Sequence, residues 1–432
     1  MLVSAKSQIK IRKVIMKIFL FSAIAATLVV GCQTVPKTTS MSKLESTPDI
    51  SGPANPIINN LSPLAAASEI ELENARRPKQ SNHRFEAAVA GNFDGADFVT
   101  HKSPQAYVDF LWGQKNPNQQ KGWKLAQESN WRDDINFYTL NGTSAFKLRP
   151  KVSNPDDFCL HAGHFVVAKF NNDELDDAAI ACTGYDGKPF PGEHSYVMLS
   201  AASGGYRLHR LTSEVSYYHG ATTLDINSDG LSDVVLTDES KGRVLGYLNL
   251  GNGKFSTGQT LLSGLSKNYT TTAVDLNNDR HAELIVGGHE VDTPTQYMPT
   301  TVFWNDGYGN FSFDRKTTLP KVAGYGIVLD YLYYAPYLFT VRTQSGKNAY
   351  QGGAVQQIDV RDFTEVAVLK NPRVRHPAKL QRVYSPSGKI VFGSLDCDRN
   401  GVDFILNDEG AMSFVRESDG ERTPAGCLSI TP

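Results

Sequence analysis

Two short segments of the chain carry oxygen-bearing side chains at positions 1, 3, 5 and 9, a spacing that can wrap one hard cation. Residues 225–233 read Asp-Ile-Asn-Ser-Asp-Gly-Leu-Ser-Asp, and residues 275–283 read Asp-Leu-Asn-Asn-Asp-Arg-His-Ala-Glu. Oxygens at positions 1, 3, 5, 7 and 9 suit calcium, which accepts six to eight oxygen ligands in loose geometry. We therefore predict two or more calcium ions. The predicted ligands are Asp225, Asn227, Asp229, Leu231 through its carbonyl, Asp233, Asp275, Asn277, Asp279, His281 through its carbonyl, and Glu283.

Two other copies of this acidic loop depart from the pattern. The copy near residue 396 is one residue short, so we treat its oxygen ligands as weaker candidates. In the copy near residue 169, Lys169 stands where the first carboxylate belongs. We expect its ammonium group to pair with Asp173 and Asp177 in place of a cation. The weaker calcium ligands are Asp396, Asp398 and Asn400.

The acidic loops recur along the chain and predict its fold. Each clear copy lies between two short apolar runs, and a second pair of runs follows, joined by a Gly-rich turn and with an aromatic residue opening the last run, as in residues 246–255 and 302–311. This unit of four strands repeats at about 50–60 residues, within the range of propeller blades. We therefore predict an all-β propeller of four-stranded blades, seven in number, with six as the alternative. The recognisable units start near Asn92, Lys169, Asp225, Asp275, Asp330 and Asp396.

The N-terminal segment has the composition of a bacterial export signal. Basic residues precede an uncharged apolar stretch, residues 18–30, which is of secretory length. Small residues before Cys32 resemble the lipobox of bacterial lipoproteins, in which the cysteine is lipidated and becomes the new N-terminus. Gln33 after that cysteine indicates sorting to the outer membrane of a Gram-negative bacterium. The expected parts are a lipoprotein signal at 1–32, a flexible tether rich in Ser, Thr, Pro and Asn at 33–80, and the propeller at 81–432.

The charge balance argues against one class of partner. The formal net charge is -2 in a chain whose residues are 20% charged. Nucleic-acid binding draws most of its affinity from basic side chains that neutralise phosphates. We therefore expect no nucleic-acid partner, and we expect membrane association through the lipid anchor alone.

The acidic loops give the chain a resemblance to the FG-GAP/VCBS repeat family, the propellers of integrin α chains and of many bacterial surface proteins. The resemblance covers roughly residues 85–415 and is most specific in the units that begin at Asp225 and Asp275. It implies that the calcium loops join the first and second strands of a blade on one face of the propeller. It also implies that partners bind on the opposite face.

Four cysteines remain besides Cys32, and an even number in an exported chain suggests disulfides. Four cysteines allow three connectivities. The strand order implied by the resemblance places Cys159, just before the first strand of its blade, beside Cys182, at the end of the second strand. We therefore expect a Cys159–Cys182 bond, with Cys397–Cys427 as the second bond.

Aromatic and polar residues gather in the segments that should meet at the face opposite the calcium loops. Three interpretations stay open: these residues fill the mouth of the propeller in a structural envelope protein, they bind a glycan or a surface protein, or they serve a polysaccharide lyase. The sequence offers no paired Glu/Asp constellation and no nucleophile motif, so we expect a recognition module more than an enzyme. The ligand-binding candidates are Tyr185, Asp186, Glu193, His194, Tyr218, Tyr269, His289 and Tyr325, and the catalytic candidates for a lyase are His164, His219 and Tyr217.

Overall fold

The computed structural model describes the chain from residue 87 onward, with gaps. The ranges are 87–94, 96–102, 134–138, 151–152, 159–171, 173–187, 189–290, 298–346, 349, 351–375, 380–384, 390–394, 402–406 and 412–416. The expected signal peptide, Cys32 and the tether lie outside these residues, as do Asp396, Asp398, Asn400, Cys397 and Cys427. Among the described residues, no helix is long and apolar enough to cross a membrane.

The described strands form six sheets in which neighbours in the chain pair antiparallel. The first sheet has three strands, β1 (Ala87–Phe93), β2 (Ala96–Lys102) and β3 (Asp134–Tyr138). The second contains β5 (Ala162–Ala168), β6 (Asp177–Cys182), β7 (Tyr196–Ser200) and β8 (Tyr206–Arg210), and β4 (Lys151–Val152) joins β8 in parallel.

The next four sheets have four strands each. The third contains β9 (Tyr218–Leu224), β10 (Asp233–Asp238), β11 (Arg243–Tyr247) and β12 (Gln259–Ser263), and the fourth contains β13 (Asn268–Val274), β14 (Glu283–Gly288), β15 (Thr301–Phe303) and β16 (Lys316–Thr318). The fifth contains β17 (Ile327–Tyr334), β18 (Tyr337–Thr343), β19 (Gln351–Asp359) and β20 (Thr364–Arg375), and the sixth contains β21 (Leu380–Tyr384), β22 (Ile390–Ser394), β23 (Val402–Leu406) and β24 (Met412–Arg416).

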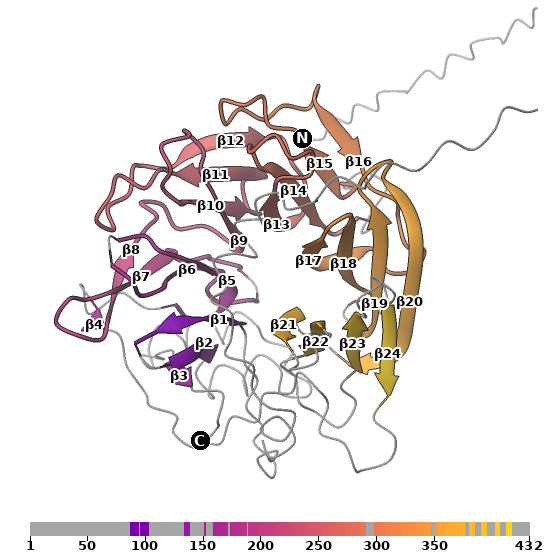
Figure 1. The fold of residues 1–432 in the computed structure, drawn as a ribbon, viewed down its shortest axis with the longest axis horizontal. Coiled ribbons are helices and arrows are strands. Elements are labelled where there is room, and N and C mark those ends of the chain that lie inside the picture. Colours follow the sequence, from indigo (N-terminus) through magenta and orange to yellow (C-terminus); the bar gives the residue numbers. More distant parts are fainter. Residues whose placement is uncertain are drawn as a thin grey trace, which may run out of the picture. The chain divides into compact units, whose positions relative to one another are not determined.

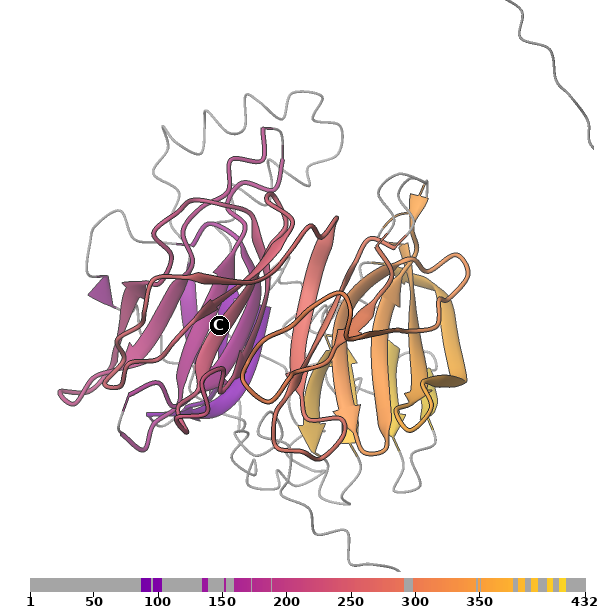
Figure 2. The same ribbon diagram turned by 90° about the horizontal axis from the view of Figure 1, so that it is seen from above.

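The first five sheets, within residues 51–432, pack successively against one another through their first strands. Strand β1 contacts β5, β5 contacts β9, β9 contacts β13, and β13 contacts β17. One buried apolar cluster joins the second sheet to the third, and a further cluster joins the third to the fourth. Figure 1 shows the sheets following one another in chain order around a common centre, and Figure 2, turned by 90°, shows the strands along their length.

This arrangement is a β-propeller, and the prediction of an all-β fold with four-stranded blades is confirmed. The described residues contain six sheets, so a count of seven blades is not confirmed. The first strands approach so closely that Gly163 of β5 has no room for a side chain. A Cβ placed there would lie 2.5 Å from the carbonyl oxygen of His219 on β9.

The acidic loops of the third and fourth sheets join the first and second strands, as the repeat pattern predicts. One other expectation was wrong. The aromatic residue opens the fourth strand in the second sheet, at Tyr206, whereas Phe255 and Phe311 precede β12 and β16 and pack against the core. The predicted acidic loop near residue 396 lies outside the described residues.

Candidate functional site

The first acidic loop folds around its own carboxylates. The Asp225 carboxylate accepts N–H groups of Asp229 and Gly230, at 3.0 and 2.8 Å, and the Asp229 carboxylate accepts the N–H of Leu231 at 2.9 Å. The Asp233 carboxylate accepts N–H groups of Ile226 and Asn249, at 2.8 and 2.7 Å. The loop is therefore curled so that its acidic side chains point inward along one short turn, which is the shape that a calcium loop requires.

The second acidic loop repeats this geometry with two changes. The Asp275 carboxylate accepts N–H groups of Asp279 and Arg280, at 3.2 and 2.9 Å. Arg280 takes the position of the glycine and adopts φ +74°, which an L residue rarely does. Glu283 closes the loop with a fully buried carboxylate, whose Oε2 accepts the N–H of Leu276 at 2.8 Å, while its Oε1 has no hydrogen-bond partner.

The carboxylates that close the two loops have raised pKa values. Burial, together with the charges of Asp229 and Asp225, raises the pKa of Asp233 to about 6, although the N–H groups of Asn249 and Ile226 lower it. Burial likewise raises the pKa of Glu283 to about 7, with Asp279 and Asp275 adding to the effect. Buried carboxylates that repel one another and leave an oxygen unpaired are the ligands that a divalent cation stabilises.

The oxygen ligands of the two acidic loops are of the type that calcium prefers, but their carboxylates are spread more widely than around a bound ion. Among the described residues, three ligand atoms from acidic, histidine or cysteine side chains lie within 4.8 Å of one another in one group, which is Cys159, Cys182 and Glu193. The two cysteines of this group are joined in a disulfide bond. The carboxylates of each acidic loop lie farther apart, because several of them accept N–H groups of their own loop. A bound calcium ion would draw them closer.

The Lys169 loop is held together without its lysine. Lys169 pairs with exposed Glu174 at 3.1 Å, and not with Asp173 and Asp177 as we expected. The Ser200 hydroxyl donates to Asp173 at 2.6 Å, and the Ser200 N–H donates to Asp177 at 2.7 Å. Ser200 therefore donates hydrogen bonds to both carboxylates that we expected the lysine to pair with.

The turn between the third and fourth strands of one blade touches the acidic loop of the blade before it. The N–H of Gly253 and the side-chain amide of Asn249 both donate to the carbonyl of Phe170, at 2.9 and 3.1 Å. At the next junction, a Cβ on Gly309 would lie 2.0 Å from the carbonyl oxygen of Ile226. Ordering an acidic loop therefore also orders the junction between two blades.

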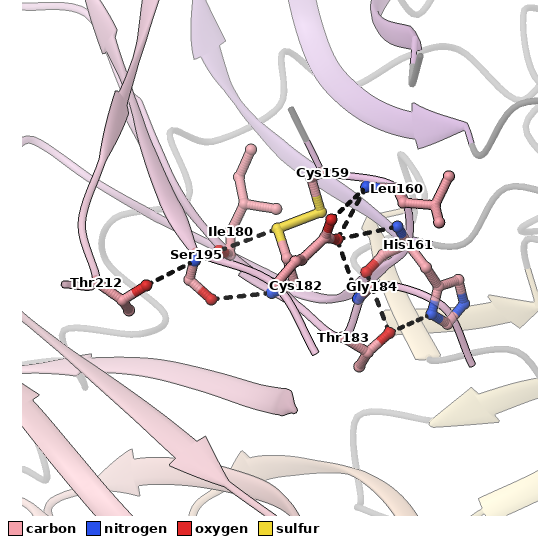
Figure 3. Close-up of a disulfide and its surroundings, with 10 residues drawn as sticks. Cys159, Leu160, His161, Ile180, Cys182, Thr183, Gly184, Ser195 and Thr212 are labelled. Atoms are coloured by element: carbon pink, nitrogen blue, oxygen red, sulfur yellow. Dashed lines mark hydrogen bonds between the residues drawn. A yellow bond between two sulfur atoms is a disulfide. The ribbon is translucent and has the colours of Figure 1, made fainter. Parts of the chain in front are cut away.

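The opposite ends of these strands carry the disulfide. Cys159 is bonded to Cys182, which confirms the pairing implied by the strand order. Figure 3 shows this bond and its surroundings. The carboxylate of Glu193 lies within 4.8 Å of both sulfur atoms. It accepts N–H groups of Leu160 and Gly184, at 2.8 and 3.0 Å. The predicted role of Glu193 in ligand binding is therefore replaced by a structural one, which is to tie the β6–β7 connector to the entrance of β5.

A row of aromatic rings crosses the inner strands at this end of the propeller. The ring of Tyr217 lies 5.3 Å from His219, His219 lies 3.5 Å from Tyr269, and Tyr269 lies 5.7 Å from His289, measured between centroids. We call these four residues the axial row. The register shifts beside His219 and Tyr269, between Leu236 and Asp238 and between Asn268 and Thr270. Such bulges re-aim side chains, and here they bring two rings of neighbouring blades together.

Two carboxylates flank the axial row. The hydroxyl of Tyr217 donates a short hydrogen bond to Asp186 on the β6–β7 connector. The N–H of Glu239 donates to the carbonyl of Tyr217 at 3.0 Å, and the Glu239 carboxylate lies 3.6 Å from the Lys267 ammonium. Burial raises the pKa of Tyr217 and of Glu239, and the charge of Asp186 adds to both shifts.

Glu239 is the residue that sequence reasoning missed. Glu239 directly follows β10, and its N–H donates to the carbonyl of Tyr217, the residue before β9. His289 takes the equivalent position after β14, where its N–H donates to the carbonyl of Lys267, the residue before β13. The signal in the sequence was its place in the connector from the second to the third strand. With Asp186, Glu239 supplies the pair of carboxylates that the sequence did not reveal.

Several candidates lie elsewhere. Tyr185 and Tyr218 are fully buried, so their predicted role in ligand binding is corrected to one in the core. Tyr325 is also buried, and its hydroxyl accepts a hydrogen bond from Gln344 at 3.4 Å. His194 is partly buried with Nδ1 2.9 Å from the carbonyl of Thr212. His164 lies on β5, partly buried, outside the axial row.

Comparisons with known proteins agree with the repeat. Residues 225–286 match the family described as FG-GAP-like repeat. No curated protein matches the chain. The solved structures that resemble it include the Dos1 propeller, with 10% identity, TM-score 0.42, and coverage of 79% of this chain and 76% of that one. A mutant of the Aleuria aurantia lectin in complex with α-methyl-L-fucoside has 9% identity, TM-score 0.40, and coverage of 81% and 96%. We draw no functional inference from structures this distant.

Proposed function

We propose that this chain, a β-propeller that carries an FG-GAP-like repeat, is a calcium-stiffened recognition module whose axial row binds a glycan. The observation that carries the proposal is the partly exposed ring of Tyr269, which stacks on buried His219 of the neighbouring blade, with the partly exposed carboxylates of Asp186 and Glu239 flanking the row. Aromatic faces pack against the apolar faces of sugar rings, and carboxylates accept hydrogen bonds from sugar hydroxyls. Both kinds of group meet here.

Calcium belongs to the proposal as a structural ion. The two acidic loops would hold it through the ligands predicted above, with Glu283 Oε1 as a buried oxygen that lacks another partner. A cation in the loop at 225–233 would stiffen the contact of Ile226 with the following blade. The axial row lies at the other ends of the same strands, so calcium would set the framework and leave the ligand to the side chains.

We also propose that the module is held at the outer membrane through a lipidated Cys32. The support is the sequence of the N-terminal segment, with its basic start, its apolar stretch and the small residues before the cysteine. A propeller on a flexible tether would then sample glycans close to the membrane surface.

One observation favours a second function, cleavage of the glycan by a lyase or hydrolase mechanism. Tyr217 is a protonated phenol whose hydroxyl donates a hydrogen bond to the carboxylate of Asp186. The backbone carbonyl of Tyr217 accepts the N–H of Glu239, which brings a second acidic residue next to it. Groups of this kind can donate and accept a proton. The catalytic candidates predicted from the sequence, Tyr217 and His219, both belong to the axial row.

Both functions are tested with a panel of polysaccharides in calcium buffer: laminarin, xylan, alginate and chitosan. We expect the full chain, purified in detergent, to be retained on at least one of them with no product formed. Growth of ultraviolet absorbance with time, from unsaturated products, would identify a lyase, and new reducing ends without that absorbance would identify a hydrolase. Absence of retention on every polysaccharide would contradict the glycan proposal and direct the search to a protein partner.

Glu239 gives the site a pH dependence that can be measured on the protein alone. Burial raises its pKa above the ordinary value of 4.5, while His289 and Lys267 lower it and Asp186 raises it. A raised native pKa means that folding takes up a proton, so this contribution to stability is complete below about pH 4.5 and is lost as the pH rises through the native pKa. We expect Glu239→Gln to gain melting temperature relative to the wild type between pH 4.5 and 7.

The control for this prediction has the opposite sign. Hydrogen bonds from Lys241 and Arg243 lower the pKa of the exposed Glu214, so its contribution is present above the unfolded pKa and is lost as the pH falls. Between pH 4.5 and 7 that contribution is already present, so the difference in melting temperature between Glu214→Gln and the wild type should stay nearly constant there and shrink only below about pH 4.5. A constant difference between Glu239→Gln and the wild type at all pH values would contradict the assignment.

A further inference from the structure

Phe190, on the β6–β7 connector, combines two features that the core of the propeller does not explain. Its side chain is 48% exposed. Its backbone adopts φ +55°, a left-handed conformation that is unfavourable for a bulky residue. Phe363 has a similar φ of +59°, but its ring packs edge-on against Trp304 in an apolar cluster, which explains its conformation. Backbone strain of this kind, when nothing in the core requires it, points to a functional contact.

The connector holds Phe190 at the end of the axial row. The N–H of Phe190 donates to the carbonyl of Gly187 at 2.6 Å, which fixes the turn. The ring of Phe190 meets the ring of Tyr217 edge-on, with 6.0 Å between centroids. Asp186 in the same connector accepts the Tyr217 hydroxyl. Asp186 and Phe190 therefore both contact Tyr217, and about half of the Phe190 side chain stays exposed to solvent.

The two ends of the connector are clamped. The Glu193 carboxylate accepts the N–H of Gly184 at 3.0 Å, which closes the segment on itself. The N–H of Glu193 donates to the carbonyl of Ser216 at 3.0 Å, just before β9. A Cβ on Gly192 would lie 2.4 Å from that same carbonyl group, so the connector lies directly on the entrance to β9. This clamping holds Asp186 and Phe190 in place before any ligand arrives, which lowers the entropy cost of binding.

We infer that Phe190 is an aromatic platform for one sugar ring, and that Asp186 beside it accepts a hydrogen bond from a hydroxyl of the same ring. This inference rests on the proposed function and specifies its ligand. The sugar unit presents an apolar C–H face to Phe190 and at least one hydroxyl at its edge to Asp186. Glu193 is a positioning residue, because its carboxylate holds the connector and takes no part in the contact.

The test separates the ring of Phe190 from its backbone. Glycine adopts φ +55° without strain, so Phe190→Gly should melt at or above the temperature of the wild type. It should also lose at least tenfold in affinity for whichever of laminarin, xylan, alginate or chitosan retains the wild-type full chain. Phe190→Tyr keeps the ring and should bind as the wild type does. Tyr308→Ala removes an aromatic side chain that is 83% exposed in the turn between β15 and β16, and it should leave affinity unchanged.

The outcomes distinguish this inference from the proposed function. If Phe190→Gly binds as tightly as the wild type while Tyr269→Ala does not bind, the platform is refuted and the glycan site stands. If the wild type binds none of the four polysaccharides, the proposed function fails, and the platform fails with it. If Phe190→Gly and Tyr308→Ala weaken binding equally, the effect is not specific to the connector, and the inference is also overturned.

Discussion

Removal of calcium is expected to lower the melting temperature of the protein by several degrees, and Asp229→Ala is expected to remove about half of that response, because the loop at 275–283 keeps its own ligands. Loops of this kind in extracellular modules bind calcium with Kd values of about 0.1–1 mM. At 10 mM calcium, one such site stabilises the folded state by roughly 1.4–2.7 kcal/mol, and two sites by about twice as much. Asp229 lies inside the first loop, where its carboxylate accepts the Leu231 N–H at 2.9 Å and its charge raises the pKa of Asp233.

The measurement is a pair of thermal melts, in excess calcium and in excess chelator, for each variant. Asp362→Ala is the matched control, because Asp362 is an exposed carboxylate that bonds to the N–H of Thr364 in its own turn, at 3.0 Å. It should keep the full response to the chelator. A melting temperature that does not change in chelator would refute calcium binding for both loops.

Breaking the buried ion pair between Arg342 and Glu290 should destabilise the fold by roughly 3–5 kcal/mol, because it leaves one buried charge uncompensated. The two groups lie 2.8 Å apart, and both side chains are 0% exposed. Glu290 also accepts the hydroxyl of Thr300 at 2.6 Å, and Arg342 also donates to Gln356 at 3.0 Å. The pair joins the β14–β15 connector to β18, and therefore joins two blades.

Denaturant unfolding of Glu290→Gln and Arg342→Met measures this effect. The double variant Glu290→Met with Arg342→Met should be more stable than either single variant, since a buried apolar pair leaves no charge without a partner. Arg361→Ala serves as the control, because Arg361 pairs with Asp359 at the surface, and its loss should change the free energy of unfolding far less than the loss of the buried pair. A loss below about 1 kcal/mol for Glu290→Gln would contradict this role.

The fold and the acidic loops were predictable from the sequence because both depend on local patterns. The alternation of apolar runs with Asp-rich loops defines a blade, and the strand order then places Cys159 next to Cys182. The prediction for Lys169 was wrong because it considered only the loop, whereas the Ser200 hydroxyl that satisfies Asp173 comes from another strand of the same sheet.

The candidate site was harder to predict because it depends on register. Tyr217 and Tyr218 are adjacent, yet Tyr217 joins the axial row while Tyr218 lies in the core. The bulge beside His219 decides which side chains turn toward the neighbouring blade, and no pattern in the sequence marks it. Glu239 was not predicted as a site residue for the same reason, since its position beside Tyr217 follows from the pairing of β9 with β10.

The most direct test of the proposed function is a calorimetric titration of the full chain with the polysaccharide that retains it, in calcium buffer, alongside Tyr269→Ala. The Tyr269 ring lies 3.5 Å from His219, at the junction of two blades, and the side chain is partly exposed. We expect saturable binding by the wild type and at least a tenfold weaker affinity for Tyr269→Ala. That variant should melt at a lower temperature, because the ring packs on the cluster of Ile327, Leu329 and Val341, but it should still be folded at the temperature of the titration. Equal affinities for the two proteins would place the ligand elsewhere and contradict binding at the axial row.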